Sequence, residues 1–206
     1  MNDFDASRWR QTPTLTGRHV RLEPLSLDHV DALIEASKDG ELWRLWYTSI
    51  PEPSGMRAYV ETALARRDSG VAMPFVVRDA QGAIVGSTRF GHMEPENRRL
   101  ELGWTWYAKR VQRTALNTEA KRLLLGHAFE VLGCGAVEFR TSWFNHASRA
   151  AIARLGAKQD GVIRNHLRMP DGSYRDTVVF SILASEWPMV RTHLDHKLAG
   201  GGEGGE

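Results

Sequence analysis

This 206-residue chain has a single cysteine, no long apolar run and no large excess of either charge. Cys134 is the only cysteine, which excludes an internal disulfide bond and a metal site built from several thiolates. No segment approaches the roughly 20 apolar residues of a membrane-spanning helix, and the opening MNDFDASRWRQ lacks the apolar middle of a signal peptide. We therefore expect a soluble, cytoplasmic protein.

The charge is balanced, with 27 basic and 25 acidic residues and a formal net charge of +2. This balance predicts neither a general nucleic-acid coat nor an acidic partner, so any electrostatic function must be local. The length and the 42% hydrophobic content suit one domain. We place it at residues 17–198, between a polar N-terminal arm (1–16) and a disordered tail of mainly glycine and glutamate (199–206).

Hydrophobic periodicity and turn signals predict alternating strands and helices. The expected elements are a strand at 19–25, helices around 30–34 and 56–64, strands at 75–77, 84–90 and 100–107, a helix at 119–132, a strand at 136–144, a helix at 145–156, two strands flanking 170–173 and a terminal helix or tail at 185–198. Hairpins are expected at DAQG (79–82) and PDGS (170–173). This order predicts an α/β protein with a mixed sheet, not a doubly wound one.

The segment VQRTALNTEA (111–120) joins a predicted strand to a predicted helix and contains no glycine. The first turn of that helix, with Asn117 or Thr118 as its N-cap, has free N–H groups and a positive dipole end that attract anions. Only one acid, Glu119, accompanies the nearby basic residues, which are Lys109, Arg110, Arg113, Lys121 and Arg122. The pattern suits a pyrophosphate site, and a solvated basic helix start fits it about as well.

Taken with its neighbours, this loop resembles a known family. The preceding ELGW (101–104), the TEA at 118–120, the N-x-x-S at 145–148 and the LGA at 155–157 are similar to GNAT superfamily N-acetyltransferases. The resemblance is strongest to the RimJ/RimL-like branch of ribosomal-protein alanine acetyltransferases, and it extends over residues 17–183. It implies the GNAT acyl-CoA N-acyltransferase fold, a central, mostly antiparallel sheet with a splayed central strand pair flanked by helices.

The resemblance also implies acetyl-CoA as co-substrate and no metal. Many members carry Q-G-x-G-x-A/G-T-E-A in this loop, and the corresponding cofactor-binding residues here are Gln112, Arg113, Thr114, Ala115, Leu116, Asn117 and Thr118. Both family glycines are replaced. A phosphate-binding backbone path stays feasible because Ala115 is small and Asn117 tolerates left-handed geometry, and Arg113 could add a charged contact.

Glu101 alternates with a stripe of apolar residues, Leu100, Leu102, Trp104 and Trp106. A carboxylate on a strand covered by helices is either paired or functional, and candidate partners are Arg89, Arg99 and Arg140. Related enzymes often use a glutamate on this strand to take a proton from the amine, usually through water. The resemblance therefore implies a catalytic role for Glu101.

Asn145 and Ser148 match the family positions that contact the pantetheine arm and approach the thioester sulfur. The same two residues would also serve as an ordinary helix N-cap and first turn. Many members place a tyrosine four residues after this serine to protonate the thiolate, but Ile152 stands here, which leaves Ser148 or water. Backbone N–H groups at the splayed end of strand 100–107 are the expected oxyanion donors.

The remaining candidates carry less information. Trp43, Trp46 and Tyr47 either line the acceptor side of the site or form a small satellite core. A structural interpretation is preferred for three kinds of residue: Cys134 as a small apolar turn residue, His127 as a packed side chain, and His193 and His196 as surface residues without a third metal ligand.

These features predict direct transfer of an acetyl group from acetyl-CoA to a primary amine in a ternary complex. A protein or peptide N-terminal α-amine is favoured, since less than about 1% of a lysine amine is neutral at pH 7.5. The alternatives are a small-molecule amine acetyltransferase and a non-catalytic CoA-binding or RNA/ribosome-associated module, which the missing glycines and tyrosine support. We expect neither a membrane nor a specific nucleic-acid partner, and we leave a homodimer open.

Overall fold

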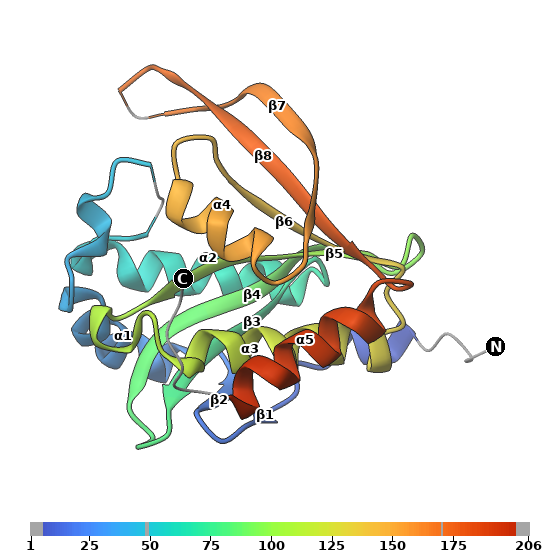
Figure 1. Cartoon of the computed structure of the whole chain (residues 1–206). Coiled ribbons are helices and arrows are strands. Elements are labelled where there is room, and N and C mark those ends of the chain that lie inside the picture. The colour runs from blue at the N-terminus through green and yellow to red at the C-terminus, as the bar shows by residue number, and fades with distance from the viewer. Residues whose placement is uncertain (1–5, 48–49, 170, 201–206) are drawn as a thin grey trace.

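The computed structural model describes residues 6–47, 50–169 and 171–200, and its centre is one eight-stranded sheet in the order β1-β2-β3-β4-β5-β6-β8-β7 (Figure 1). The strands are β1 (Leu15–Thr16), β2 (Val20–Pro24), β3 (Met73–Asp79), β4 (Ile84–Glu94), β5 (Arg99–Tyr107), β6 (Ala136–Ser142), β7 (Lys158–Arg168) and β8 (Tyr174–Leu183). The α-helices are α1 (Val30–Lys38), α2 (Met56–Asp68), α3 (Ala115–Gly126), α4 (His146–Ala153) and α5 (Trp187–Ala199). Short 3-10 turns are η1 (Ala6–Arg10), η2 (Leu27–His29), η3 (Leu42–Arg44), η4 (Pro53–Gly55) and η5 (Lys109–Val111), and a π turn, η6 (His127–Val131), follows α3.

The sheet is antiparallel except at its centre, where β5 and β6 run parallel. These two strands pair over a short stretch, Arg99–Glu101 with Ala136–Glu138, and then separate. The rest of β6 pairs with β8 and the rest of β5 with β4. The mixed sheet with a splayed central pair is thus confirmed, and the separation leaves a gap lined by both strands.

Local signals account for the two hairpins. In the β3–β4 turn, Asp79 accepts hydrogen bonds from the backbone N–H groups of Gln81 and Ala83 at 3.1 and 2.9 Å, and Gly82 has a φ of 84° that suits glycine. β7 and β8 form the second predicted hairpin, in which Pro170 lies outside the described residues.

Helices cover both faces of the sheet: α3 and α5 pack together on one, and α1 and α2 lie on the other (Figure 1). The core between them contains fully buried side chains such as Leu22, Phe75 and Leu124. The terminal segment forms α5, where Trp187 donates a hydrogen bond to Glu130 at 2.8 Å. Among the described residues, every helix is too short or too polar to cross a bilayer.

The beginning of the chain differs from its predicted form. Residues 6–16 pack on the domain, because Trp9 is only 2% exposed and donates a hydrogen bond to the carbonyl of Leu132 at 3.2 Å. One buried aromatic ring removes enough apolar surface from water to hold a polar segment in place. Within the predicted arm, Trp9 and β1 therefore belong to the folded domain, whereas residues 1–5 and 201–206 lie outside the described part of the chain.

Candidate active site

A cavity of about 640 Å³ lies where β5 and β6 separate. Its lining comes from β5 (101–107), from β6 (139–142), from the early turns of α3 and α4, and from the β7–β8 hairpin. Segments distant in the sequence therefore meet around one space. A cavity of this size is in the range of small-molecule and cofactor sites.

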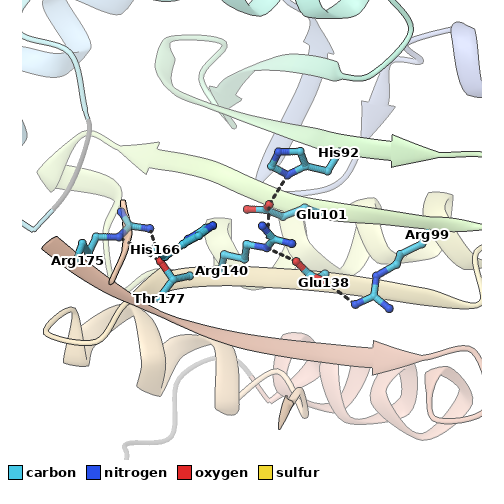
Figure 2. Close-up of polar contacts among 8 residues, drawn as sticks. All are labelled: His92, Arg99, Glu101, Glu138, Arg140, His166, Arg175 and Thr177. Atoms are coloured by element: carbon cyan, nitrogen blue, oxygen red, sulfur yellow. Dashed lines mark hydrogen bonds and ion pairs between the residues drawn. The ribbon is translucent and has the colours of Figure 1, made fainter. Parts of the chain in front are cut away.

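Glu101 lies in this cavity with 7% of its side chain exposed. Its Oε2 is 2.8 Å from Nδ1 of His92 and 3.7 Å from Nε of Arg140 (Figure 2). Burial raises the pKa of Glu101, and the contacts with His92 and Arg140 offset that effect only in part. The pKa of this carboxyl group is thus closer to neutral pH than that of an exposed glutamate.

Glu138 on β6 pairs with Glu101 on β5, and its pKa is shifted in the opposite direction. It accepts a hydrogen bond from Arg99 Nη2 at 2.5 Å and another from Nε of Arg140. Burial opposes ionisation of Glu138, but the two arginines outweigh it and lower the pKa. Of the adjacent carboxylates, Glu138 therefore holds the fixed charge and Glu101 is the one suited to exchange a proton.

An irregularity in β5 shapes the wall beside Glu101. The register between β4 and β5 shifts after Ser87, and Trp104 has a φ of 50°. The Trp104 ring lies 5.5 Å from the His92 ring instead of continuing the stripe of Leu100 and Leu102, so the predicted placement of Trp104 is wrong. Strand alternation fails here because a bulge inserts an extra residue.

The loop before α3 has a different cap from the predicted one. Thr114 is the N-cap, and its hydroxyl accepts a hydrogen bond from the N–H of Leu116 at 3.3 Å. Asn117 and Thr118 lie within the helix, so neither caps it. The left-handed position is Arg113, with a φ of 60°, at one of the two family glycines. The turn that glycine would favour is therefore present without glycine.

Side chains of this loop have distinct positions. Gln112 Nε2 donates to the carbonyl of Tyr107 at 2.9 Å and fastens the loop to the end of β5. Leu116 is buried in the core, which leaves only its backbone available to a ligand. Ala115 begins the helix, whose first N–H groups lack intrahelical carbonyl partners.

The five basic residues predicted around the helix start do not converge. Arg110 bonds Asp79 at 3.1 Å and Arg122 bonds Asp195 at 2.6 Å, so both are directed to carboxylates of the domain. Lys121 is buried in the cavity, where Nζ donates to Thr105 Oγ1 at 2.9 Å. Burial lowers the pKa of Lys121 to about 7.

Arg113 and Lys109 are thus the exposed cations that remain beside the loop. Glu119, the single acid, faces away from it and accepts backbone hydrogen bonds from Arg18, His19 and Val20 at 2.6–3.0 Å. The loop can therefore offer an anion backbone N–H groups, the helix dipole and two side chains, a smaller charge than the sequence predicts.

Asn145 and Ser148 lie at the start of α4, where this helix borders the cavity. Asn145 is the N-cap of α4 and accepts a hydrogen bond from the N–H of Ser148 at 3.0 Å. Both residues also line the cavity, together with Ile152 at the family tyrosine position. Asn117 lines the same cavity, and its Oδ1 is buried with no hydrogen-bond partner in the part of the chain that the structure describes. An acceptor left in this state fits an N–H donor such as an amide of a pantetheine arm.

The aromatic connector contributes less to the cavity than expected. Tyr47 lines it, but Trp43 and Trp46 do not belong to its lining. Trp46 is 66% exposed and packs against Tyr47 and Phe144, with ring centroids 5.6 and 5.5 Å apart. Among the three predicted acceptor-side residues, Tyr47 alone is placed at the site.

Two of the weaker candidates are packed, as interpreted. Burial raises the pKa of the Cys134 thiol to about 12, which leaves no thiolate for an acyl-cysteine mechanism near pH 7. The His127 ring stacks on Phe90 with centroids 6.3 Å apart, and burial lowers its pKa to about 4. His193 hydrogen-bonds the carbonyl of Arg154 at 3.1 Å. The described residues contain no group of three or more side chains placed to hold a metal.

Several polar residues of the cavity were not singled out by the sequence, among them His92, His166 and Arg175, and Arg140 was considered only as a partner of Glu101. Counting residues back from the β4–β5 turn would have placed His92 opposite Glu101, whereas a register shift between Gly91 and Glu94 pairs Gly91 with Glu101 and leaves His92 beside it. No comparable signal exists for Arg175, because its position depends on β8 lying beside β6.

Comparison with known proteins agrees with this geometry. Residues 19–158 match the Acetyltransferase (GNAT) domain family, and the chain belongs to that family. A curated relative is YdaF of Bacillus subtilis (strain 168), provisionally named a ribosomal N-acetyltransferase, at 32% identity over 106 residues. That alignment covers 52% of this chain and 57% of YdaF, so a little over half of each protein is compared.

Solved structures extend the similarity to most of the chain. A protein from T. thermophilus, provisionally named an acetyltransferase, is 37% identical with a TM-score of 0.78, covering 90% of this chain and 96% of its own. Mycobacterium smegmatis RimJ in complex with CoA-disulfide has a TM-score of 0.78 at 21% identity, covering 93% of this chain and 96% of its own. At that identity the likeness to RimJ shows the fold, which is the one predicted.

Proposed function

We propose that this protein transfers an acetyl group from acetyl-CoA to the α-amine at the N-terminus of a protein or peptide. The observation that carries the proposal is Glu101, a buried carboxylate with a raised pKa in the cavity between the separated strands β5 and β6. A ribosomal protein is a reasonable acceptor, given the name of YdaF, and would place the reaction in the cytoplasm.

Residues of the donor side fit acetyl-CoA, which supplies an activated acyl group as a thioester. The N–H groups at the start of α3 and the exposed Arg113 suit its phosphates, and the unpartnered Oδ1 of Asn117 suits an amide N–H. Asn145 and Ser148 line the same cavity at the start of α4. We assign the stabilisation of the oxyanion to N–H groups of β5 that lie beyond its pairing with β6.

Glu101 accepts the proton of the attacking amine, directly or through one water molecule. Its half-exposed partner His92, 2.8 Å away, offers that proton a path to solvent. Ser148 or water returns a proton to the leaving thiolate, since Ile152 has no acidic group. Glu138 and Arg140 keep the charge beside Glu101 fixed during this exchange.

The strength of this base favours an α-amine over a lysine side chain. A glutamate with a raised pKa is still a weaker base than a lysine amine, which is almost entirely protonated near pH 7. An α-amine, with a pKa near 7.7–8.0, is neutral to the extent of tens of per cent at pH 7.5 and needs little help. We therefore expect peptide N-termini to be acetylated faster than lysine side chains.

The donor half of the proposal is tested by thermal shift with acetyl-CoA, CoA, dephospho-CoA and ATP. A ligand at about 100 times its dissociation constant adds about 2.7 kcal/mol of apparent stability. We expect a shift with acetyl-CoA and CoA but not with ATP. The absence of any shift would mean that a loop without glycine does not bind the donor, and the proposal would fail.

The catalytic half is tested with Glu101→Gln. Turnover of acetyl-CoA with N-terminal peptides should fall by about 10²–10⁴-fold, the usual contribution of a general base. The CoA-induced thermal shift should stay as in the wild type, because the substitution lies away from the loop before α3. Unchanged turnover would remove Glu101 from the mechanism.

A further inference from the structure

The cavity contains more positive than negative side chains. Arg66, Lys121, Arg140 and Arg175 line it, against one carboxylate, that of Glu101. This excess of basic side chains favours a ligand that carries a negative group. The question is which of these cations is available to bind it.

Among the described residues, Arg175, Arg66 and Lys121 form no ion pair, but Arg66 is exposed and burial lowers the pKa of Lys121 to about 7, which leaves Arg175 as the half-buried, fully charged one. It lies at the start of β8, and among the described residues its guanidinium donates only to the hydroxyl of Thr177, at 3.2 and 3.4 Å. Its hairpin neighbour Arg164 differs, since it bonds Asp176 at 2.5 Å while remaining 80% exposed. Arg140 differs too, because it already forms ion pairs with Glu138 and Glu101.

Two other basic side chains, His166 and Arg140, lie near Arg175. His166 of β7 shares the Thr177 hydroxyl, at 3.0 Å, and Figure 2 shows both residues on the hairpin beside the Glu101 network. Burial lowers the pKa of His166, and the charges of Arg140 and Arg175 add to this effect. Burial also lowers the pKa of Arg175, opposed by the carboxylate of Glu101. A half-buried guanidinium in such a place gains much from an added anion.

We propose that Arg175 binds a carboxylate of the acceptor, so that the preferred acceptors are amines with an acidic side chain among their first residues. This inference rests on the proposed function and adds its substrate class. Glu101 receives the amine end of the acceptor from β5, and Arg175 receives the acidic end from β8. The shared chemistry also admits an acidic amino acid or another small amine with a carboxylate.

The contact acts mainly on binding. The ion pair between Arg175 and the acceptor carboxylate is equally strong in the bound substrate and in the transition state. Its loss therefore raises KM and leaves kcat nearly unchanged. A charged hydrogen bond of this kind is expected to alter KM by about ten- to hundredfold. A merely structural role of Arg175 would instead impair all acceptors equally.

The experiment compares amidated hexapeptides that carry Glu or Gln at position 1, 2 or 3 and are otherwise alanine. Free glutamate and glutamine form a second arm that separates small acceptors from peptides. The proteins are the wild type, Arg175→Gln, Arg175→Lys and, as matched control on the same hairpin, Arg164→Gln. Initial rates give kcat and KM, and titration into the CoA-bound protein gives peptide affinity independently of turnover.

We expect a Glu peptide to have a KM about tenfold or more below its Gln counterpart with the wild type and with Arg164→Gln. The preference should vanish with Arg175→Gln and survive in part with Arg175→Lys. Equal KM values and equal affinities for Glu and Gln acceptors, or a preference that persists in Arg175→Gln, would overturn the inference. If only free glutamate reacts, with an Arg175-dependent KM, the carboxylate site stands and the N-terminal peptide function fails.

Discussion

Lys121 shows how one side chain can be held in an unfavourable state at a site. It is 7% exposed, hydrogen-bonds the hydroxyl of Thr105 and forms no ion pair with the described carboxylates. An ammonium buried in this way is costly, and its pKa falls from 10.5 to about 7. At neutral pH the amine is therefore divided between its charged and uncharged forms.

The stability of the protein should carry the signature of this lysine. Below pH 7 both folded and unfolded states hold its proton, and the full penalty applies. Between pH 7 and 10.5 the unfolded state binds more protons, so stability rises with pH. From pH 7 to 9 the rise should be about 2 kcal/mol. Urea unfolding at pH 7 and pH 9 should show this rise in stability for the wild type and not for Lys121→Met.

The difference between the two proteins removes other groups from the comparison, including Tyr107 and Cys134, whose pKa values are raised by burial. The exposed Lys109 supplies a control: Lys109→Met should change stability by less than about 0.5 kcal/mol and keep the wild-type pH dependence. Identical pH curves for the wild type and Lys121→Met would show that Lys121 keeps an ordinary pKa.

For single residues, the sequence predicts the position of a side chain where that position depends on neighbours along the chain. Glu101 could be predicted because side chains alternate on a strand and the family places a glutamate there. His92 went unnoticed, because its contact with Glu101 also depends on the register shift between Gly91 and Glu94 and on its own φ of 43°. Arg175 likewise reaches the cavity only because β8 pairs with β6.

At the scale of elements, the loop before α3 makes a left-handed turn at Arg113 without glycine. Arg113 adopts a φ of 60°, a conformation that costs a non-glycine residue about 1–2 kcal/mol. Thr114 caps the helix and Gln112 ties the loop to Tyr107. These two contacts hold the strained turn, and they leave the Arg113 side chain exposed at the helix start.

Arg113→Gly and Arg113→Ala separate the geometry of this turn from its charge. Arg113→Gly relieves the strain and should be about 1 kcal/mol more stable than Arg113→Ala. Both lose the guanidinium, so both should bind CoA about two- to fivefold more weakly, and less so at high salt. Urea unfolding and calorimetric titration at two salt concentrations measure the two effects. A wild-type affinity in both variants would mean that Arg113 does not contact CoA.

Turns and helix ends could be predicted where the residues that determine them lie close together in the sequence. The β3–β4 turn follows from Asp79 and Gly82, which act within five residues. The start of α3 was misplaced because several residues could cap it, and Thr114 does so only after the loop path is fixed. The bulge at Trp104 was missed because alternation assumes a regular strand.

For the whole molecule, the central feature is a sheet whose two halves, β1 to β5 and β6 to β8, are joined by a short stretch of strand pairing. β5 and β6 pair only at Arg99–Glu101 with Ala136–Glu138, and the cavity occupies the rest of their junction. The mixed sheet could be predicted from the order of elements, and its splay from the family resemblance. Neither periodicity nor composition indicates which strands separate, because that depends on contacts between distant segments.

A donor bound in this cavity should bridge the two halves and suppress their relative opening. Amide hydrogen exchange with and without CoA should therefore slow in 104–117, from β5 into α3, and in 141–151, from β6 into α4. At about 100 times the dissociation constant, amides that exchange only when the ligand leaves should slow by up to about 100-fold. The β3–β4 turn at 79–84, which does not line the cavity, serves as an internal control and should not change. Slowing confined to 158–183, or spread evenly over the chain, would contradict a donor site between the strands.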